Sequence, residues 1–198
     1  MAMEFSGEFE LEGVSPEEAW IVLSDPIAVR NALKGCRYIT PMDDDFNFDD
    51  YEPEEDLETL PEADPEVVEA RAFREGTVYA ALMQVGVGSV KPRFETRVTI
   101  EERAFPKMVA TGGGDASGSS FEMESGMNIV ETESGSEIEW WTTADVSGRI
   151  AQLGGRVLNP VADRIVSNFF ENIQEQMQAV EGGDEEGNSV TDRLRNLL

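Results

Sequence analysis

Histidine is absent from this 198-residue sequence, and cysteine occurs only once, at Cys36. The chain therefore lacks the most common general base, the histidine of Ser-His and Cys-His nucleophile pairs, and the most common transition-metal ligand. One cysteine cannot form an internal disulfide, and without histidine it cannot complete a structural zinc site. We therefore expect no catalytic residues, no metal site and a reducing, cytoplasmic location.

Long apolar runs are missing as well. The sequence has no run of about 18 consecutive apolar residues, so no transmembrane helix is predicted. The first residues, MAMEFSGEFELEG, lack a basic region followed by an apolar run, which argues against a secretory signal. We expect peripheral membrane contact at most.

Basic residues are scarce: 15 lysines and arginines stand against 41 aspartates and glutamates, which gives a net charge of −26. Such a chain repels nucleic-acid phosphates and anionic membrane surfaces, so we expect no nucleic-acid partner. Three explanations remain: adaptation to a high-salt cytoplasm, a docking surface for a basic partner, and metal buffering. We favour the first, a halophile-like acidic proteome, because the acidity extends beyond one tail and lysine is so rare.

The longest apolar-periodic stretch runs from Ser147 to Val180. Its apolar residues recur every three or four positions, which is the spacing along one face of an α-helix. Gly154-Gly155 and Pro160 interrupt the pattern, and we expect a kink there because glycine weakens a helix and proline removes a backbone donor. The stripe comprises Ile150, Leu153, Val157, Val161, Ile165, Phe169, Ile173, Met177 and Val180.

The segments before this helix predict strands and two short helices. Residues 3–12 alternate between apolar and polar side chains, as in an antiparallel strand with one face in water. Ser15-Pro16 and Asp25-Pro26 each combine a capping side chain with proline at the first helical position, which predicts a short helix after each. Further strands are expected at 36–41 with a continuation at 67–73, and at 77–87, 91–102, 107–112, 120–133 and 137–146.

Short turns join most neighbouring strands, so the sheet should be antiparallel. The predicted fold class is α+β: a curved seven-stranded antiparallel sheet wrapped on a long C-terminal helix, with two short helices after the first strand. We expect residues 1–180 to form one domain. Residues 43–70, half of them acidic and none basic, should be a solvated or disordered insertion. Residues 181–198 should be a flexible linker and a short amphipathic segment that docks on the chain itself, a partner or a membrane.

Strand parity indicates which side chains face the helix. The expected lining is apolar, rich in methionine and aromatic residues, and nearly free of ionisable groups. Methionine adapts to different ligands, and a curved sheet that grips a helix often leaves a pocket. Parity alone allows a filled core as well as a ligand cavity. The candidate cavity residues are Met83, Phe94, Met108, Met123, Met127 and Trp140 on the sheet and Leu153, Val157, Val161 and Phe169 on the helix.

Several segments together carry a family resemblance. They are Phe5-Ser6-Gly7, SPEEAW from Ser15 with Asp25-Pro26, Gly35-Cys36, VGVGSVKPRF from Val85, and GRIAQLGGR from Gly148 through Phe169-Phe170. Over residues 3–41 and 67–178 the chain resembles the CoxG family of carbon monoxide dehydrogenase subunits, within the START-like, or SRPBCC, superfamily of helix-grip proteins. Lys34, where the family usually has proline, and the acidic insertion after Met42 depart from that pattern.

The resemblance implies a helix-grip fold with an internal cavity and an accessory role. We expect a non-enzymatic protein that binds a hydrophobic ligand, a lipid or an isoprenoid quinone, and takes no other cofactor. The family further implies recruitment of a molybdenum-containing CO dehydrogenase or related hydroxylase, peripherally at the inner face of the membrane. Two alternatives stay open: a polyketide cyclase or hydrolase-type enzyme on the same fold, and a protein-interaction module that uses Trp141, expected on the outer face of its strand.

The charge generates a prediction about salt. At about 0.1 M salt the Debye length is roughly 10 Å, which spans neighbouring carboxylates, and at about 1 M it is roughly 3 Å. We expect the melting temperature to rise between about 0.1 and 3 M KCl, because screening weakens the self-repulsion of the folded state. A melting temperature independent of salt would indicate instead that the acidic residues form a docking surface.

Overall fold

A seven-stranded antiparallel sheet and one long helix make up most of the chain in the computed structural model, which describes residues 1–54, 57–60, 62–86 and 91–181. The predicted α+β helix-grip fold class is confirmed. In chain order the elements are β1 (Ala2–Glu12), α1 (Pro16–Ser24), α2 (Pro26–Ala32), β2 (Cys36–Pro41), α3 (Pro65–Arg71), β3 (Val78–Gln84), β4 (Arg93–Ala104), β5 (Lys107–Asp115), β6 (Ser119–Glu131), β7 (Gly135–Gly148), the 3-10 helix η1 (Ala151–Leu153) and α4 (Gly155–Glu181).

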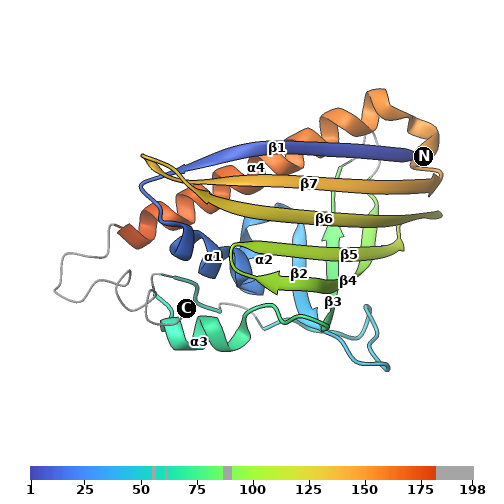
Figure 1. The fold of residues 1–198 in the computed structure, drawn as a ribbon. Coiled ribbons are helices and arrows are strands. Elements are labelled where there is room, and N and C mark those ends of the chain that lie inside the picture. The colour runs from blue at the N-terminus through green and yellow to red at the C-terminus, as the bar shows by residue number, and fades with distance from the viewer. Residues whose placement is uncertain (55–56, 61, 87–90, 182–198) are drawn as a thin grey trace.

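The strands lie in the order β1-β7-β6-β5-β4-β3-β2, and every neighbouring pair is antiparallel. The first strand therefore pairs with the last, while β2 to β7 follow one another as a meander. Helix α4 crosses one face of the sheet behind β1 and β7 in the view of Figure 1 and packs closely on α2. We call the face toward α4 the inner face and the opposite one the outer face.

Side chains cap the two short helices as the sequence predicts. The Ser15 hydroxyl accepts a hydrogen bond from the Glu18 backbone N–H at 3.3 Å, and the Glu18 carboxylate accepts from the Ser15 N–H at 2.8 Å. Asp25 ends α1, and its carboxylate accepts from the Ile27 N–H at 2.9 Å to begin α2. These caps satisfy backbone donors that a helix N-terminus leaves without partners, so they fix where both helices begin.

The long helix begins later than its periodicity predicts. Residues up to Gly148 belong to β7, residues 151–153 form η1, and α4 starts at Gly155. Gly154 adopts φ = 74°, a left-handed conformation that ends η1 and that a residue with a side chain would adopt only with strain. Pro160 lies inside α4 but close to its start. The prediction of helix for 147–153 is wrong because pairing with β6 and the turn at Gly148 take precedence over the apolar spacing.

The acidic insertion also differs from its prediction. Residues 67–73 do not continue β2 as a strand; α3 forms there, because Asp64 accepts from the Glu66 N–H and Pro65 occupies the first helical position. Several apolar side chains of the insertion are buried, which the prediction of a solvated segment did not anticipate. They are Phe48, Leu60, Ala63 and Val68.

Part of the insertion covers the outer face of β2 and β3. Phe48 packs there with Tyr38, Ala80 and Leu82, and the Tyr38 hydroxyl donates to the Phe48 carbonyl oxygen at 3.0 Å. The Arg97 guanidinium lies 5.5 Å from the centre of the Phe48 ring. A few aromatic residues thus bury enough apolar surface to fix a segment whose acidic side chains face solvent.

The predictions about the C-terminal segment and about membrane-spanning helices extend over residues that the structure describes only in part. The predicted flexible linker and amphipathic segment at 181–198 lie outside the described residues, apart from the last residue of α4. Among the described helices, none is long and apolar enough to cross a membrane.

A buried ion pair joins the insertion to the two short helices α1 and α2, which we call the helix pair. Arg71 of α3 donates from Nε and from one terminal nitrogen to the two carboxylate oxygens of Asp25, at 2.8 and 2.7 Å. The Asp25 side chain is 1% exposed and that of Arg71 is 21% exposed. Arg71 also donates to the Glu58 carbonyl oxygen at 2.8 Å, so one guanidinium connects the insertion loop, α3 and the start of α2.

We predict that R71A lowers the free energy of unfolding by about 3 kcal/mol, because it leaves the buried Asp25 carboxylate without its cation. Urea denaturation at fixed KCl measures this. R74A is the matched control: it removes the same charge from an exposed arginine that donates to the Ala70 carbonyl oxygen, and should cost about 0.5 kcal/mol. Equal losses for the two variants would contradict a structural role for the Asp25–Arg71 pair.

Candidate ligand-binding site between the sheet and the last helix

The inner face of the sheet carries the apolar side chains that the alternation predicts, and they form two separate buried clusters. The helix-pair cluster lies toward α1 and α2 and joins Leu11, Ile138 and Tyr79 of the sheet with Ile173 of α4. The α4-start cluster consists of buried Ala116, Ile150 and Leu158 with partly buried neighbours. The inner face is therefore closed by packing at both ends.

Between these clusters several inner-face residues are only half-buried and belong to neither cluster. On the sheet they are Phe5, Met123 and Ala144, and on α4 they are Ala162 and Ile165. Met123 is paired with Ala144 on one side and with Gly112 on the other, so these residues are neighbours. Incomplete burial of apolar side chains between a sheet and its covering helix marks the place where a ligand could contact them.

Two glycines of this region, Gly112 and Gly7, place no side chain on the inner face. A Cβ atom at Gly112 would lie 3.1 Å from Cε of Met123 and 3.0 Å from the Arg97 carbonyl oxygen, so a side chain here would displace its neighbours. A Cβ atom at Gly7 would lie 3.0 Å from Cζ2 of Trp140, whose indole therefore covers that glycine. The glycine run at 112–114 thus belongs to β5, which lies between β4 and β6, and Gly112 leaves the inner face of that strand without a side chain.

The polar groups of this region are hydroxyls. The Ser125 and Thr142 hydroxyls form a hydrogen bond of 2.6 Å on the inner face, and Thr142 also donates to the Glu124 carbonyl oxygen at 3.2 Å. Hydroxyls of this kind can donate to a carbonyl of a ligand or accept from a ligand hydroxyl. The arrangement is suited to a largely apolar molecule with one or two neutral polar groups.

Two carboxylates are buried in the described part of the chain, but both serve the helix caps. Glu18 accepts from Ser15, and Asp25 accepts from the Ile27 N–H and from Arg71. Both lie at the helix pair instead of between the two clusters. They do not form the pair of convergent carboxylates that acid–base catalysis in the cavity would need.

The structure places the ten predicted cavity residues in five different surroundings. Met108 is buried in the helix-pair cluster, and Met127, Trp140 and Phe169 pack against it. Phe94, Val157 and Val161 pack against the α4-start cluster. Met123 lies between the clusters, and Met83 is half-buried opposite Phe94. Leu153 lies on η1 with 39% of its surface exposed, because the helix starts only at Gly155.

Strand alternation places Ala144 on the inner face and Phe5 and Gly7 together on one face of β1, but the candidate cavity residues do not include them. Gly112 was not selected either, because a glycine has no side chain that could line a cavity. Strand register is needed to recognise that Gly7 lies opposite Trp140 and that Gly112 lies opposite Met123.

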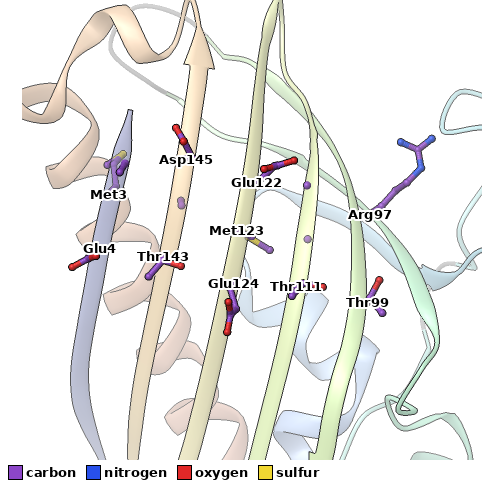
Figure 2. Close-up of a pocket in the computed structure, with 14 residues that line it drawn as sticks. Met3, Glu4, Arg97, Thr99, Thr111, Glu122, Met123, Glu124, Thr143 and Asp145 are labelled. Atoms are coloured by element: carbon purple, nitrogen blue, oxygen red, sulfur yellow. The ribbon is translucent and has the colours of Figure 1, made fainter.

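The outer face has two open hollows of about 640 and 430 Å³. Figure 2 shows the larger one, where Glu4, Thr143, Glu122 and Thr111 come from four adjacent strands, with α4 behind the sheet. Arg97 lies at the right of that view. Carboxylate oxygens of Glu8, Glu137 and Glu139 approach one another within 4.8 Å on the same face. Gly112, Met123 and Ala144 also line the larger hollow, although strand alternation directs their Cα–Cβ side to the opposite face of the sheet.

Cys36 begins β2 and is partly buried, and its thiol donates to the Tyr38 carbonyl oxygen at 3.5 Å. Burial raises the pKa of this thiol from 9.0 to about 11, because desolvation disfavours the thiolate, although the Arg30 charge opposes the change. A group with this pKa is protonated at neutral pH. Cys36 is thus unsuited to act as a nucleophile.

Comparisons with known proteins agree with this geometry. A family model described as CoxG, a subunit of carbon monoxide dehydrogenase, matches residues 65–178. None of the curated proteins compared with the chain matches it.

Solved structures match over most of the chain. A conserved protein from Geobacillus kaustophilus is 20% identical, with 89% of this chain and 95% of that one covered and a TM-score of 0.65. The Zhui aromatase/cyclase from Streptomyces sp. R1128 is 9% identical, with coverage of 90% and 93% and a TM-score of 0.54. Ara h 8.0201 is 15% identical, with coverage of 88% and 97% and a TM-score of 0.51. At these identities the likeness establishes the fold alone.

The thiol generates a prediction about pH. At pH 8 a cysteine of pKa about 11 has about 100-fold less thiolate than one with the ordinary value, so alkylation of Cys36 should be about 100-fold slower than that of a free thiol. Iodoacetamide labelling followed by mass spectrometry measures the rate, and the same chain in urea is the control. A native rate that equals the unfolded rate would contradict the raised pKa.

Proposed function

Because the chain belongs to the CoxG family of carbon monoxide dehydrogenase subunits, we propose that it binds a hydrophobic small molecule between the sheet and α4. The class we favour is a lipid or an isoprenoid quinone. In this proposal the protein acts without catalysis, as an accessory or recruitment factor for a molybdenum-containing CO dehydrogenase or a related hydroxylase.

The half-buried apolar residues between the two clusters carry the ligand proposal. Phe5, Met123 and Ala144 of the sheet and Ile165 of α4 are half-buried, and none belongs to either buried cluster. An apolar ligand would complete their burial, at about 25 cal/mol for each Å² of apolar surface removed from water. The thioether of Met123 suits ligands of different shape.

The neighbouring hydroxyl pair supports a ligand with a carbonyl group. The Thr142 and Ser125 hydroxyls share one hydrogen bond of 2.6 Å, and Thr142 also donates to the Glu124 carbonyl oxygen, so an apolar lipid chain could pass without leaving a buried donor unpaired. A quinone carbonyl could instead accept a hydrogen bond from either hydroxyl. This neutral, adaptable surface is typical of carriers, whereas a cyclase or hydrolase would need ionisable groups aimed at the substrate.

The accessory role rests on family membership, because no residue pattern in this chain identifies a particular enzyme. Binding of a hydrophobic ligand and association with an oxidoreductase are compatible, since a carrier must meet the protein that supplies or consumes its ligand. We propose that this takes place in the cytoplasm, with peripheral contact at the inner face of the membrane.

A titration with coenzyme Q2, a short-chain isoprenoid quinone, tests the ligand site. Trp140 lies on the inner face and should be quenched when the quinone binds. We expect A144F to weaken Q2 binding by at least about tenfold, because the added ring occupies the space between the two clusters. Native mass spectrometry after gentle purification, followed by lipid extraction, identifies any ligand that is already bound.

T143F is the matched control, because Thr143 adjoins Ala144 but lines the hollow on the outer face. It places the same phenyl ring on the opposite side of the sheet and should leave Q2 affinity within about twofold. Absence of Q2 and lipid binding by the wild-type chain, or equal weakening by the two variants, would contradict a site under α4.

A further inference from the structure

The outer face of the sheet is divided into two unlike halves. Over β2 and β3 it is covered by the insertion through Phe48 and its aromatic neighbours. Over β1, β7 and β6, which lie side by side in Figure 1, the described residues place no such cover. The second half is therefore the part of this sheet face that remains accessible to another molecule.

The two halves also differ in charge. On β4, arginines occur among acidic residues and pair with them, as in Arg93 with Glu95 at 3.2 Å, and Lys107 of β5 pairs with Glu102 of β4 at 2.7 Å. The strands β1, β6 and β7 contain no lysine or arginine. Their outward-facing acidic residues, which we call the acidic face together with Trp141, are Glu4, Glu8, Glu10, Glu12, Glu122, Glu124, Glu137, Glu139 and Asp145. The Met1 amino group pairs with the last of these at 2.7 Å.

Trp141 lies near the middle of the acidic face and is 36% exposed. Its strand neighbours are Ser6 on β1 and Gly126 on β6, both small. A Cβ atom at Gly126 would lie 2.6 Å from Nε1 of Trp141, so the indole rests on the backbone of that glycine. The glycine thus lets a large aromatic ring lie across the sheet with one side toward solvent.

Uncompensated carboxylates adjoin the indole. Glu8, Glu139 and Trp141 line the same hollow of about 430 Å³, and carboxylate oxygens of Glu8, Glu137 and Glu139 lie within 4.8 Å of one another. Within the described residues, none of these three glutamates forms an ion pair with lysine or arginine. Lys107 also lines this hollow, but its ammonium pairs with a glutamate of β4. The indole therefore lies beside negative charge that no cation of the sheet neutralises.

We propose that the acidic face is a docking surface for a protein partner that presents arginine. A guanidinium is planar, stacks on an indole, and donates in pairs to carboxylates, so it suits a ring flanked by Glu8 and Glu139. Other occupants fit less well: a second copy would bring the same negative charge, and anionic membranes and nucleic acids would be repelled.

The inference deepens the accessory role proposed above and rests on it for the existence of a partner protein. It adds where that partner binds and what chemistry it presents. It does not depend on a ligand under α4, because Trp141 and Ala144 point to opposite faces of the same strand. The two proposals can therefore fail independently.

NMR of the full-length chain during titration with a Gly-Arg repeat peptide tests this surface, at the lowest KCl concentration at which the protein stays folded. We expect the indole N–H resonance of Trp141 to shift more than those of Trp20 and Trp140. A Gly-Lys repeat peptide should bind several-fold more weakly, because an ammonium neither stacks nor donates in a fork. W141A should lower the affinity for the Gly-Arg peptide by about tenfold.

Two triple variants separate this site from general attraction to a negative protein. E8Q/E137Q/E139Q should weaken the Gly-Arg peptide by about tenfold. E52Q/E62Q/E66Q removes three charges from exposed positions of the insertion and should change the affinity by less than about twofold. Near-ultraviolet circular dichroism verifies that each variant keeps its fold.

Equal losses for the two triple variants, or an unmoved Trp141 resonance, would overturn the proposal in favour of diffuse charge attraction. Sedimentation that reveals a dimer abolished by W141A would assign the face to a second copy and overturn it as well. W141A should bind Q2 with the affinity of the wild type. If no variant binds Q2 while the Gly-Arg peptide still binds, the result contradicts the ligand site alone.

Discussion

The pairing of β1 with β7 is the constraint on which the rest of this structure depends. It joins residues from the two ends of the fold in one register, with Phe9 opposite Ile138 and Glu8 opposite Glu139. Since strand side chains alternate between faces, a slip by one residue would bring Glu8 and Glu10 to the inner face and expose Leu11. The register is therefore fixed by burial, and it determines at once which residues meet α4 and which form the acidic face.

Two consecutive tryptophans on β7 lie on opposite faces of the sheet. Trp140 points inward over Gly7 of β1, and Trp141 points outward over Gly126 of β6. Each indole needs a neighbour without a side chain, because a Cβ atom at either glycine would lie 3.0 Å or less from the ring. One strand thus supplies an aromatic side chain to the proposed ligand site and another to the proposed docking surface, separated by the thickness of the sheet.

The insertion shows how an acidic segment can be part of a folded domain. Its apolar residues are few, but they are placed where they bury: Phe48 on the outer face of the sheet, and Leu60, Ala63 and Val68 against the helix pair. Composition predicted solvation because it averages over the segment, whereas burial depends on the individual side chains that find partners. By covering β2 and β3, the insertion also leaves β1, β7 and β6 as the accessible half of the outer face.

The sequence by itself determined the local features: the capping residues at Ser15 and Asp25, the alternation of the strands and the helical stripe. Each depends on residues close together in the chain, so spacing reveals it. Only the tertiary structure decided the start of α4 at Gly155 and the exposure of Leu153. It also decided the division of the inner face into two clusters and of the outer face into a covered and an acidic half. These depend on which strands become neighbours and which side chains meet across the sheet, and contacts between residues distant in the chain leave no periodic signal in the sequence.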